Sequence, residues 1–139
     1  MNRRPRRRTA FTLMEILLVL AILVVLGSMV SLGYVKIQQE ANKKATKAQL
    51  TLLEGAVNTY ILDVGSPPTD LSGLVTVPPD LANPTKWAGP YLDKENLPQD
   101  PWNQDFQYEI VDQANAKFRI WSNGPDQQPG SSDDITTTL

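Results

Sequence analysis

The chain has 139 residues, of which 41% are hydrophobic and 20% charged, with a formal net charge of −2 and neither cysteine nor histidine. This length allows one small domain, and the missing residue types exclude disulfides, thiol nucleophiles, Ser-His-Asp triads and zinc sites built from histidine or cysteine. Five of the 13 basic residues precede Phe11, so the rest of the chain holds eight basic and 15 acidic residues. Nucleic acid is therefore not an expected partner, because phosphate contacts need clustered Lys or Arg. An enzyme is therefore not expected, since it would have to work with carboxylates, Ser, Lys or Tyr alone.

Residues 1–10 form a basic leader, and an apolar segment follows over residues 11–35 with Glu15 as its one charged residue. Roughly 20 apolar residues suffice for a helix to cross a bilayer, so residues 11–35 are predicted to span a membrane. The arginines before this segment are expected to stay in the cytoplasm, which places the C-terminal part on the far side.

An ordinary secretory signal peptide is the alternative interpretation of this beginning. The small residues Ser31 and Gly33 have the spacing for cleavage before Tyr34, which would release a soluble binding domain. The apolar run exceeds the roughly 7–15 residues of a signal-peptide core, and this difference favours the anchor.

Residues 36–64 predict that the helix continues beyond the membrane as an amphipathic segment. Apolar residues recur there at three- and four-residue steps, the period of one helix face. The predicted stripe consists of Ile37, Ala41, Ala45, Ala48, Leu52, Ala56 and Tyr60, widened by Leu53, Val57 and Ile61. Gly65, followed by two prolines, predicts the end of the helix.

Prolines interrupt residues 65–105 and predict a loop, with a short helix or turn near residues 71–75. Its aromatic residues are expected to pin the loop to the helix by core packing. These residues are Trp87, Tyr91 and Trp102.

Residues 106–139 predict a β-hairpin followed by an acidic loop. Residues 106–111 and 117–123 alternate in the manner of strands around a polar turn. The expected fold class is therefore α+β, in which a long helix, membrane-spanning in its first half, packs its amphipathic second half against a small antiparallel sheet.

Glu15 needs an explanation, because an ionisable residue inside a spanning segment usually has a specific partner. The plain alternative is that Glu15 lies near the interface and reaches water. Cleavage of the leader between Ala10 and Phe11 would create an α-amine at Phe11, one helical turn before Glu15. In a packed array of helices this amine is expected to meet the carboxylate of a neighbouring subunit, since an unpaired charge in lipid is costly.

The stretch RRRTAFTLMEILLVLAILVVLGSMV resembles the N-terminus of type IV pilins and type II secretion pseudopilins. In that superfamily a prepilin peptidase removes a short basic leader, here between Ala10 and Phe11, and the new N-terminal residue is N-methylated. Gly usually precedes the cut, where this chain has Ala10. The resemblance implies a pilin-like, lollipop-shaped fold and an inner-membrane precursor with a periplasmic C-terminal domain.

Further segments resemble the major pseudopilins of type II secretion systems, so the resemblance covers about residues 9–135. These segments are ANKKATKAQLTLLEGAVNTYILDVGSPPT, LPQDPWNQDFQYEI and WSNGPDQQPGSSDDI, with Asn103 and Gln127 where the family usually has Gly. The resemblance implies a structural subunit that polymerises with its own copies into a periplasmic pseudopilus and pushes folded substrates through the outer membrane. Minor pseudopilins and an inner-membrane assembly platform are the further partners that it implies.

The C-terminal loop is acidic, and hard oxygen ligands suit Ca²⁺, which takes about six to eight of them. The spacing does not match an EF-hand, and from the residues alone a solvated acidic tail is the plainer interpretation. In the family this loop binds calcium. The resemblance implies side-chain ligands from Asp126, Ser131, Asp133 and Asp134, and backbone carbonyl ligands from Asn123 and Gln128.

Two alternatives of other kinds stay open. A surface type IV pilus subunit for motility, adhesion or DNA uptake is the nearest, although this chain cannot form the C-terminal disulfide of cysteine-bonded pilins. A carboxylate enzyme would have to use a pair such as Asp100 and Asp105 beside Trp102, but an Asp-Pro-Trp turn is more often structural.

Overall fold

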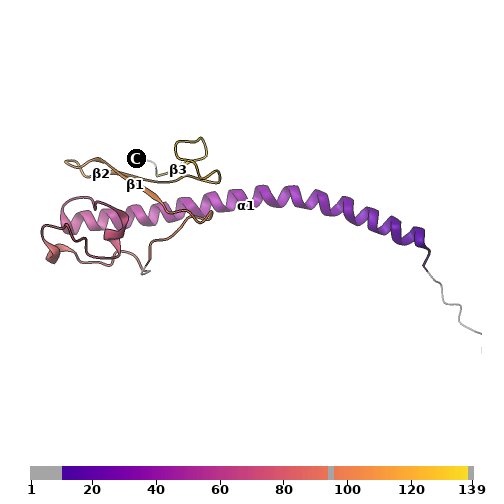
Figure 1. Ribbon diagram of the computed structural model, residues 1–139, viewed down its shortest axis with the longest axis horizontal. Helices are drawn as coiled ribbons and strands as arrows, with labels where there is room; N and C mark the ends of the chain where they lie inside the picture. The colour runs from indigo at the N-terminus through magenta and orange to yellow at the C-terminus, as the bar shows by residue number, and fades with distance from the viewer. Residues whose placement is uncertain (1–10, 94–95, 138–139) are drawn as a thin grey trace, which may run out of the picture. The chain divides into compact units, whose positions relative to one another are not determined.

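The computed structural model describes residues 11–93 and 96–137 (Figure 1). The chain divides into two compact units, Met1–Gln39 and Glu40–Leu139. The described residues contain one α-helix, α1 (Leu13–Val64), which contributes residues to both units.

In the first unit, the large apolar side chains of α1 are exposed to solvent. Their exposed fractions between residues 13 and 26 run from 50% at Val19 to 81% at Leu13. Over the part of the chain that the structure describes, no helix is both long and apolar enough to cross a membrane. The spanning segment predicted at residues 11–35 is therefore not confirmed and stays a prediction.

In the second unit, α1 and the sheet share one hydrophobic core. Leu50, Leu53 and Val57 of α1 are at most 1% exposed and belong to the same cluster as Ile120 of the sheet. Burying aliphatic side chains of this size is the main favourable term in folding. This core makes the second unit a folded head.

The buried face of α1 agrees with the predicted stripe only in part. The later members of the stripe are buried as predicted, namely Leu53, Ala56, Val57 and Tyr60. Ile37 and Leu52 are 70% and 69% exposed, whereas Thr46 and Leu50 are buried. The alanines in the predicted stripe fit almost any environment, so they carried little information about which face is covered. Thr46 can be buried because its hydroxyl donates a hydrogen bond to the carbonyl of Asn42 at 2.9 Å.

The helix α1 ends at Val64 and is followed by Gly65, as its sequence predicts. Gly65 has a φ of 95° and its amide donates to the Ile61 carbonyl at 2.8 Å, which is the left-handed C-terminal cap that glycine favours. Two short 3₁₀ helices follow, Leu71–Leu74 and Pro84–Lys86. The first lies where the sequence predicts a short helix or turn, and the second was not predicted.

The loop after α1 is held by its aromatic residues, as predicted. Trp87, Tyr91 and Trp102 are partly buried against the core. The Tyr91 hydroxyl donates to Asp63 of α1 at 2.9 Å, and the Trp87 indole donates to the carbonyl of Gly73 at 2.8 Å. Aromatic packing with satisfied polar tips therefore joins the loop to the helix.

The sheet has three antiparallel strands in the order β1-β2-β3 (Figure 1). Strands β1 (Gln107–Asp112) and β2 (Lys117–Ser122) form the predicted hairpin. Strand β3 (Ile135–Thr136) pairs with the end of β2 and was not predicted, since two residues are too short to show alternation.

Candidate functional site

Glu15 lies in the first turn of α1 and is exposed. Its amide donates to the Thr12 hydroxyl at 3.3 Å and to the Thr12 carbonyl at 3.1 Å. Thr12 is thus the N-cap residue, and Thr-x-x-Glu is the sequence pattern of a capping box. The sequence prediction considered only the charge of Glu15 and did not include this helix cap. None of the residues that the structure describes forms an ion pair with the Glu15 carboxylate.

The predicted processing site lies at the boundary of the described residues. Ala10 is outside them, and Phe11 is 76% exposed. Cleavage, N-methylation and the pairing of the Phe11 amine with Glu15 therefore stay predictions.

The loop between β2 and β3 brings together the four predicted side-chain ligands. Ser131 Oγ lies 2.6 Å from Asp133 Oδ1, 3.2 Å from Asp134 Oδ1 and 3.3 Å from Asp126 Oδ1. The hydroxyl has one proton, so it can donate to one of these three carboxylates at a time. Its hydrogen bond lowers the pKa of Asp133 below the usual range. The cluster therefore concentrates negative charge that a single hydroxyl does not balance.

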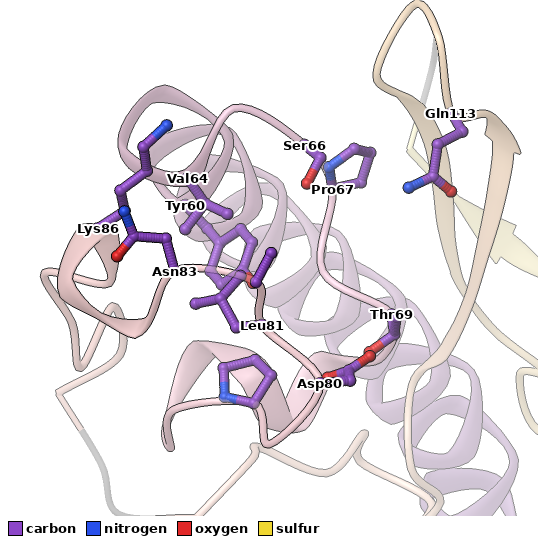
Figure 2. Close-up of a pocket in the computed structure, with 12 residues that line it drawn as sticks. Tyr60, Val64, Ser66, Pro67, Thr69, Asp80, Leu81, Asn83, Lys86 and Gln113 are labelled. Carbon is purple, nitrogen blue, oxygen red and sulfur yellow. The ribbon is translucent and has the colours of Figure 1, made fainter.

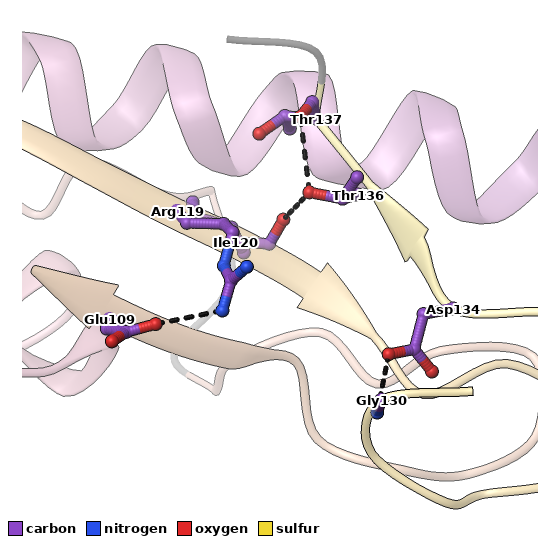
Figure 3. Close-up of polar contacts among 7 residues, drawn as sticks. All are labelled: Glu109, Arg119, Ile120, Gly130, Asp134, Thr136 and Thr137. Atoms are coloured by element: carbon purple, nitrogen blue, oxygen red, sulfur yellow. Dashed lines mark hydrogen bonds and ion pairs between the residues drawn. The ribbon is translucent and has the colours of Figure 1, made fainter. Parts of the chain in front are cut away.

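The loop backbone folds around the same carboxylates. The Gln128 amide donates to Asp126 Oδ1 at 2.9 Å. The Gly130 amide donates to Asp134 Oδ2 at 2.8 Å, as Figure 3 shows. At the start of the loop, the Asn123 side-chain oxygen is buried and has no hydrogen-bond partner among the described residues. The predicted carbonyl ligands, Asn123 and Gln128, thus belong to the same loop as the carboxylates.

Carboxylate, hydroxyl and carbonyl oxygens are the type of ligand that a hard cation prefers, but in this loop they are not arranged around a common metal position. Among the residues 11–93 and 96–137, no group of three or more His, Cys, Asp or Glu side chains is arranged to hold a metal ion. The three carboxylates converge on the Ser131 hydroxyl instead. Ca²⁺ binds in flexible geometries to carboxylates, hydroxyls and carbonyls, so the donor set suits it, and the calcium site stays a prediction.

Asp100 has the contacts of a structural residue. Asp100 is 3% exposed, and both of its carboxylate oxygens accept hydrogen bonds: Oδ1 from the amides of Trp102 and Gln104, and Oδ2 from the Ser122 hydroxyl at 2.6 Å. Asp105 is exposed and accepts a hydrogen bond from another side chain. These contacts favour the structural interpretation of the Asp-Pro-Trp turn.

A surface pocket of about 350 Å³ lies near the end of α1 (Figure 2). Tyr60 and Val64 of α1 line it together with Leu81, and Asp80 and Lys86 supply one charge of each sign. Burial raises the pKa of the Tyr60 hydroxyl, so this group stays neutral at physiological pH. None of the predicted site residues lines this pocket.

Comparison with known proteins places these features in a family. The family model described as "Type II secretion system (T2SS), protein G" matches residues 33–138. The chain is 37% identical over 133 residues to the type II secretion system core protein G of Pectobacterium carotovorum subsp. carotovorum, which covers 93% of this chain and 83% of that protein. It is 37% identical over 134 residues to the protein of the same name from Klebsiella pneumoniae, which covers 94% of each.

A solved structure supports the same assignment. The major pseudopilin from the type 2 secretion system of enterohaemorrhagic Escherichia coli is similar with a TM-score of 0.60 and 31% sequence identity, over 74% of this chain and 91% of that chain. This similarity confirms the pilin-like α+β fold, and the named relatives favour the pseudopilus over the surface type IV pilus. The family match covers most of the chain and agrees with the resemblance in its sequence, so the chain belongs to the type II secretion system protein G family.

Proposed function

We propose that this chain, a structural pseudopilus subunit of a type II secretion system, works by polymerising through α1 into a periplasmic filament. The observation that carries this proposal is the apolar surface of α1 between residues 13 and 26. Its large side chains are at least half exposed, and the described part of the chain does not cover them. A continuous exposed apolar surface of this kind favours association with lipid or with other proteins.

Before assembly, residues 11–35 anchor the precursor in the inner membrane by a single pass. The support is the sequence, with five arginines before Phe11 and one charged residue between Phe11 and Val35. The N-terminus is then cytoplasmic and the head periplasmic. In this proposal prepilin peptidase cleaves between Ala10 and Phe11, and the new amine is methylated.

During assembly, the Glu15 carboxylate pairs with the Phe11 amine of a neighbouring subunit. The position of Glu15 supports this role, because the first turn of α1 places the carboxylate close to the new N-terminus. Addition of subunits at the base then pushes folded substrates toward the outer membrane. Minor pseudopilins and an inner-membrane assembly platform are the partners of this step.

Variants of Glu15 test this assembly role. We expect Glu15→Ala and Glu15→Gln to be inserted and processed normally but to lose filament formation, because the partner amine would then lack a counter-charge in an apolar setting. The measurement is filament yield by electron microscopy, with processed subunit quantified by mass spectrometry. Thr12→Ala is the matched control, since it removes the cap and keeps the charge, so its yield should stay near that of the wild type. A normal filament yield from Glu15→Gln would rule out the pairing.

Calcium bound to the loop between β2 and β3 is the second part of the proposal. It would neutralise the carboxylates of Asp126, Asp133 and Asp134 and stiffen the head. The support is their convergence within 3.3 Å of one hydroxyl, at Ser131.

Chelation and Asp126→Ala test the calcium site. Each should lower the Tm of the head, because an ion that binds only the folded state stabilises that state by mass action. The expected gain is about 2.7 kcal/mol at a free calcium concentration of about 100 times Kd. The measurement is Tm with calcium and with chelator, and equal values for the wild type would count against the site.

A further inference from the structure

Asp100 organises the turn that precedes the sheet. Its Oδ1 accepts hydrogen bonds from the amides of Trp102 at 3.0 Å and Gln104 at 2.8 Å, and its own amide donates to the Gln104 carbonyl at 2.9 Å. A buried carboxylate is costly unless its oxygens are hydrogen-bonded, and these contacts satisfy Oδ1. The second oxygen, Oδ2, remains available for a contact outside the turn.

Ser122 makes that contact from the end of β2. It is fully buried, and its hydroxyl donates to Asp100 Oδ2 at 2.6 Å while accepting from the Gly124 amide at 3.1 Å. A serine hydroxyl has a single proton, so the bond to Asp100 fixes which side of the oxygen faces Gly124. Asp100 therefore orients the group that holds the first residues of the acidic loop.

Ser122 also lies at the other end of the same loop. It pairs with Ile135, where the chain returns to the sheet as β3. Gly124 has a φ of 69°, and a Cβ atom there would overlap the carbonyl of Asp133. The beginning and the end of the loop thus touch each other next to Ser122.

A second contact joins the Asp100 turn to the loop. The Gln127 side-chain amide donates to the carbonyl of Trp102 at 3.4 Å. This hydrogen bond is long, so we assign the main role to Asp100 and Ser122.

We propose that Asp100 and Ser122 form a positioning pair that holds the two ends of the loop at residues 123–134 together, so that less of the loop has to become ordered when it binds calcium. The pair touches no predicted ligand side chain and acts through Gly124 and the β2–β3 pairing. Groups that orient metal ligands typically contribute about 10- to 100-fold in affinity. A loop that is already ordered also loses less entropy on binding. This inference rests on the calcium site proposed above.

Calcium affinity of the full chain in detergent micelles tests the pair. The protein is stripped with chelator and titrated with calcium by calorimetry. Asp100→Asn keeps the shape of the side chain but replaces one acceptor oxygen by an NH₂ group. This group cannot accept the hydrogen bond from the Ser122 hydroxyl or, in the other orientation, those from the amides of Trp102 and Gln104. Ser122→Ala removes the hydroxyl with little change in volume and provides a second variant if the first does not fold. We expect each to bind calcium roughly 10- to 100-fold more weakly than the wild type.

Asp112→Asn is the matched control for Asp100→Asn. Asp112 accepts hydrogen bonds from the amides of Ala114 and Asn115 in the β1–β2 turn, so the substitution changes a similar turn that does not belong to the acidic loop. Its calcium affinity should equal that of the wild type.

The Tm of the stripped and calcium-loaded forms separates positioning from general stability. A purely structural role lowers the Tm of both forms alike and leaves the affinity unchanged, which would overturn the inference. If Asp126→Ala loses calcium while Asp100→Asn and Ser122→Ala keep wild-type affinity, only the positioning pair is refuted. If the wild type binds no calcium, the calcium site and the positioning pair are refuted together.

Discussion

The two halves of α1 differ in where their apolar side chains lie. Between residues 13 and 26 the large apolar side chains are at least 50% exposed, whereas Leu50, Leu53 and Val57 are at most 1% exposed. Both halves are helical and rich in Leu and Val, so helix formation alone does not determine burial. The difference is that the sheet and the proline-rich loop cover the second half.

The two halves of α1 therefore depend on different contacts. The head is stabilised by contacts within one chain, so its stability should respond to substitutions in its own core. The first half presents an apolar surface that other molecules have to cover, which is the expected property of a subunit that moves from a membrane into a filament. Substitutions in the core of the head should therefore change its free energy of unfolding, whereas substitutions in the first half of α1 should not.

Leu53→Ala should have the largest effect on the head. Removing a fully buried leucine leaves a cavity, and we expect a loss of about 2–5 kcal/mol in the free energy of unfolding. The neighbouring Leu52, 69% exposed, and Leu20 in the first half, 52% exposed, provide matched controls with changes within about 0.5 kcal/mol. The measurement is denaturant unfolding of the full chain in micelles, followed by tryptophan fluorescence, since all three tryptophans lie in the head. A similar loss in Leu20→Ala would contradict the division.

Tyr108→Phe should stabilise the head by about 1 kcal/mol. The Tyr108 hydroxyl is buried without a hydrogen-bond partner among the described residues, and its burial raises its pKa. Tyr91→Phe is the control with the opposite expected sign, because the Tyr91 hydroxyl donates to Asp63 and accepts from the Ala88 amide. The same unfolding measurement applies, and a destabilised Tyr108→Phe variant would indicate that the hydroxyl has a partner.

Gln127→Gly should give the smallest gain, about 0.5–1 kcal/mol. Gln127 has a φ of 59°, and the left-handed conformation costs a residue with a side chain about 1–2 kcal/mol. The greater freedom of Gly in the unfolded chain offsets roughly 0.5–1 kcal/mol of this gain. Ala116→Gly, at a φ of 52° in the hairpin turn, is the control with a similar gain in stability. A loss of stability in Gln127→Gly would mean that its contact with Trp102 outweighs the strain.

Two positive φ values fall at departures from the family pattern. Asn103 and Gln127 stand where the resemblance places Gly, and both have φ near 60°. The backbone thus keeps the conformation that Gly favours although the side chain has changed. Asn tolerates this region better than Gln does, because its short polar side chain can bond locally.

Much of the fold could be predicted because the signals were local. Helical periodicity predicted α1, and alternation predicted the β1–β2 hairpin. The buried face of α1 was predicted correctly around Leu53 and Val57 but not before Leu50, where the predicted stripe consists mainly of small alanines that fit any face. Strand β3 was missed because it has two residues.

The candidate sites were less predictable because their contacts join distant segments. Asp100 and Ser122 are 22 residues apart, and neither residue is unusual in its own stretch of sequence. The clustering of Asp126, Ser131, Asp133 and Asp134 was expected from a family resemblance, since the spacing alone matched no known metal motif. The cap at Thr12 was a local signal that sequence reasoning had available and did not use.

The intact mass of the protein extracted from membranes of its native host tests the assembly proposal most directly. The proposal predicts a chain that begins at Phe11 and carries one added methyl group, which places Glu15 one helical turn from a modified amine. A chain that begins at Tyr34 and is found in the soluble fraction would contradict the proposal, because Glu15 and the apolar half of α1 would then have been removed with a signal peptide.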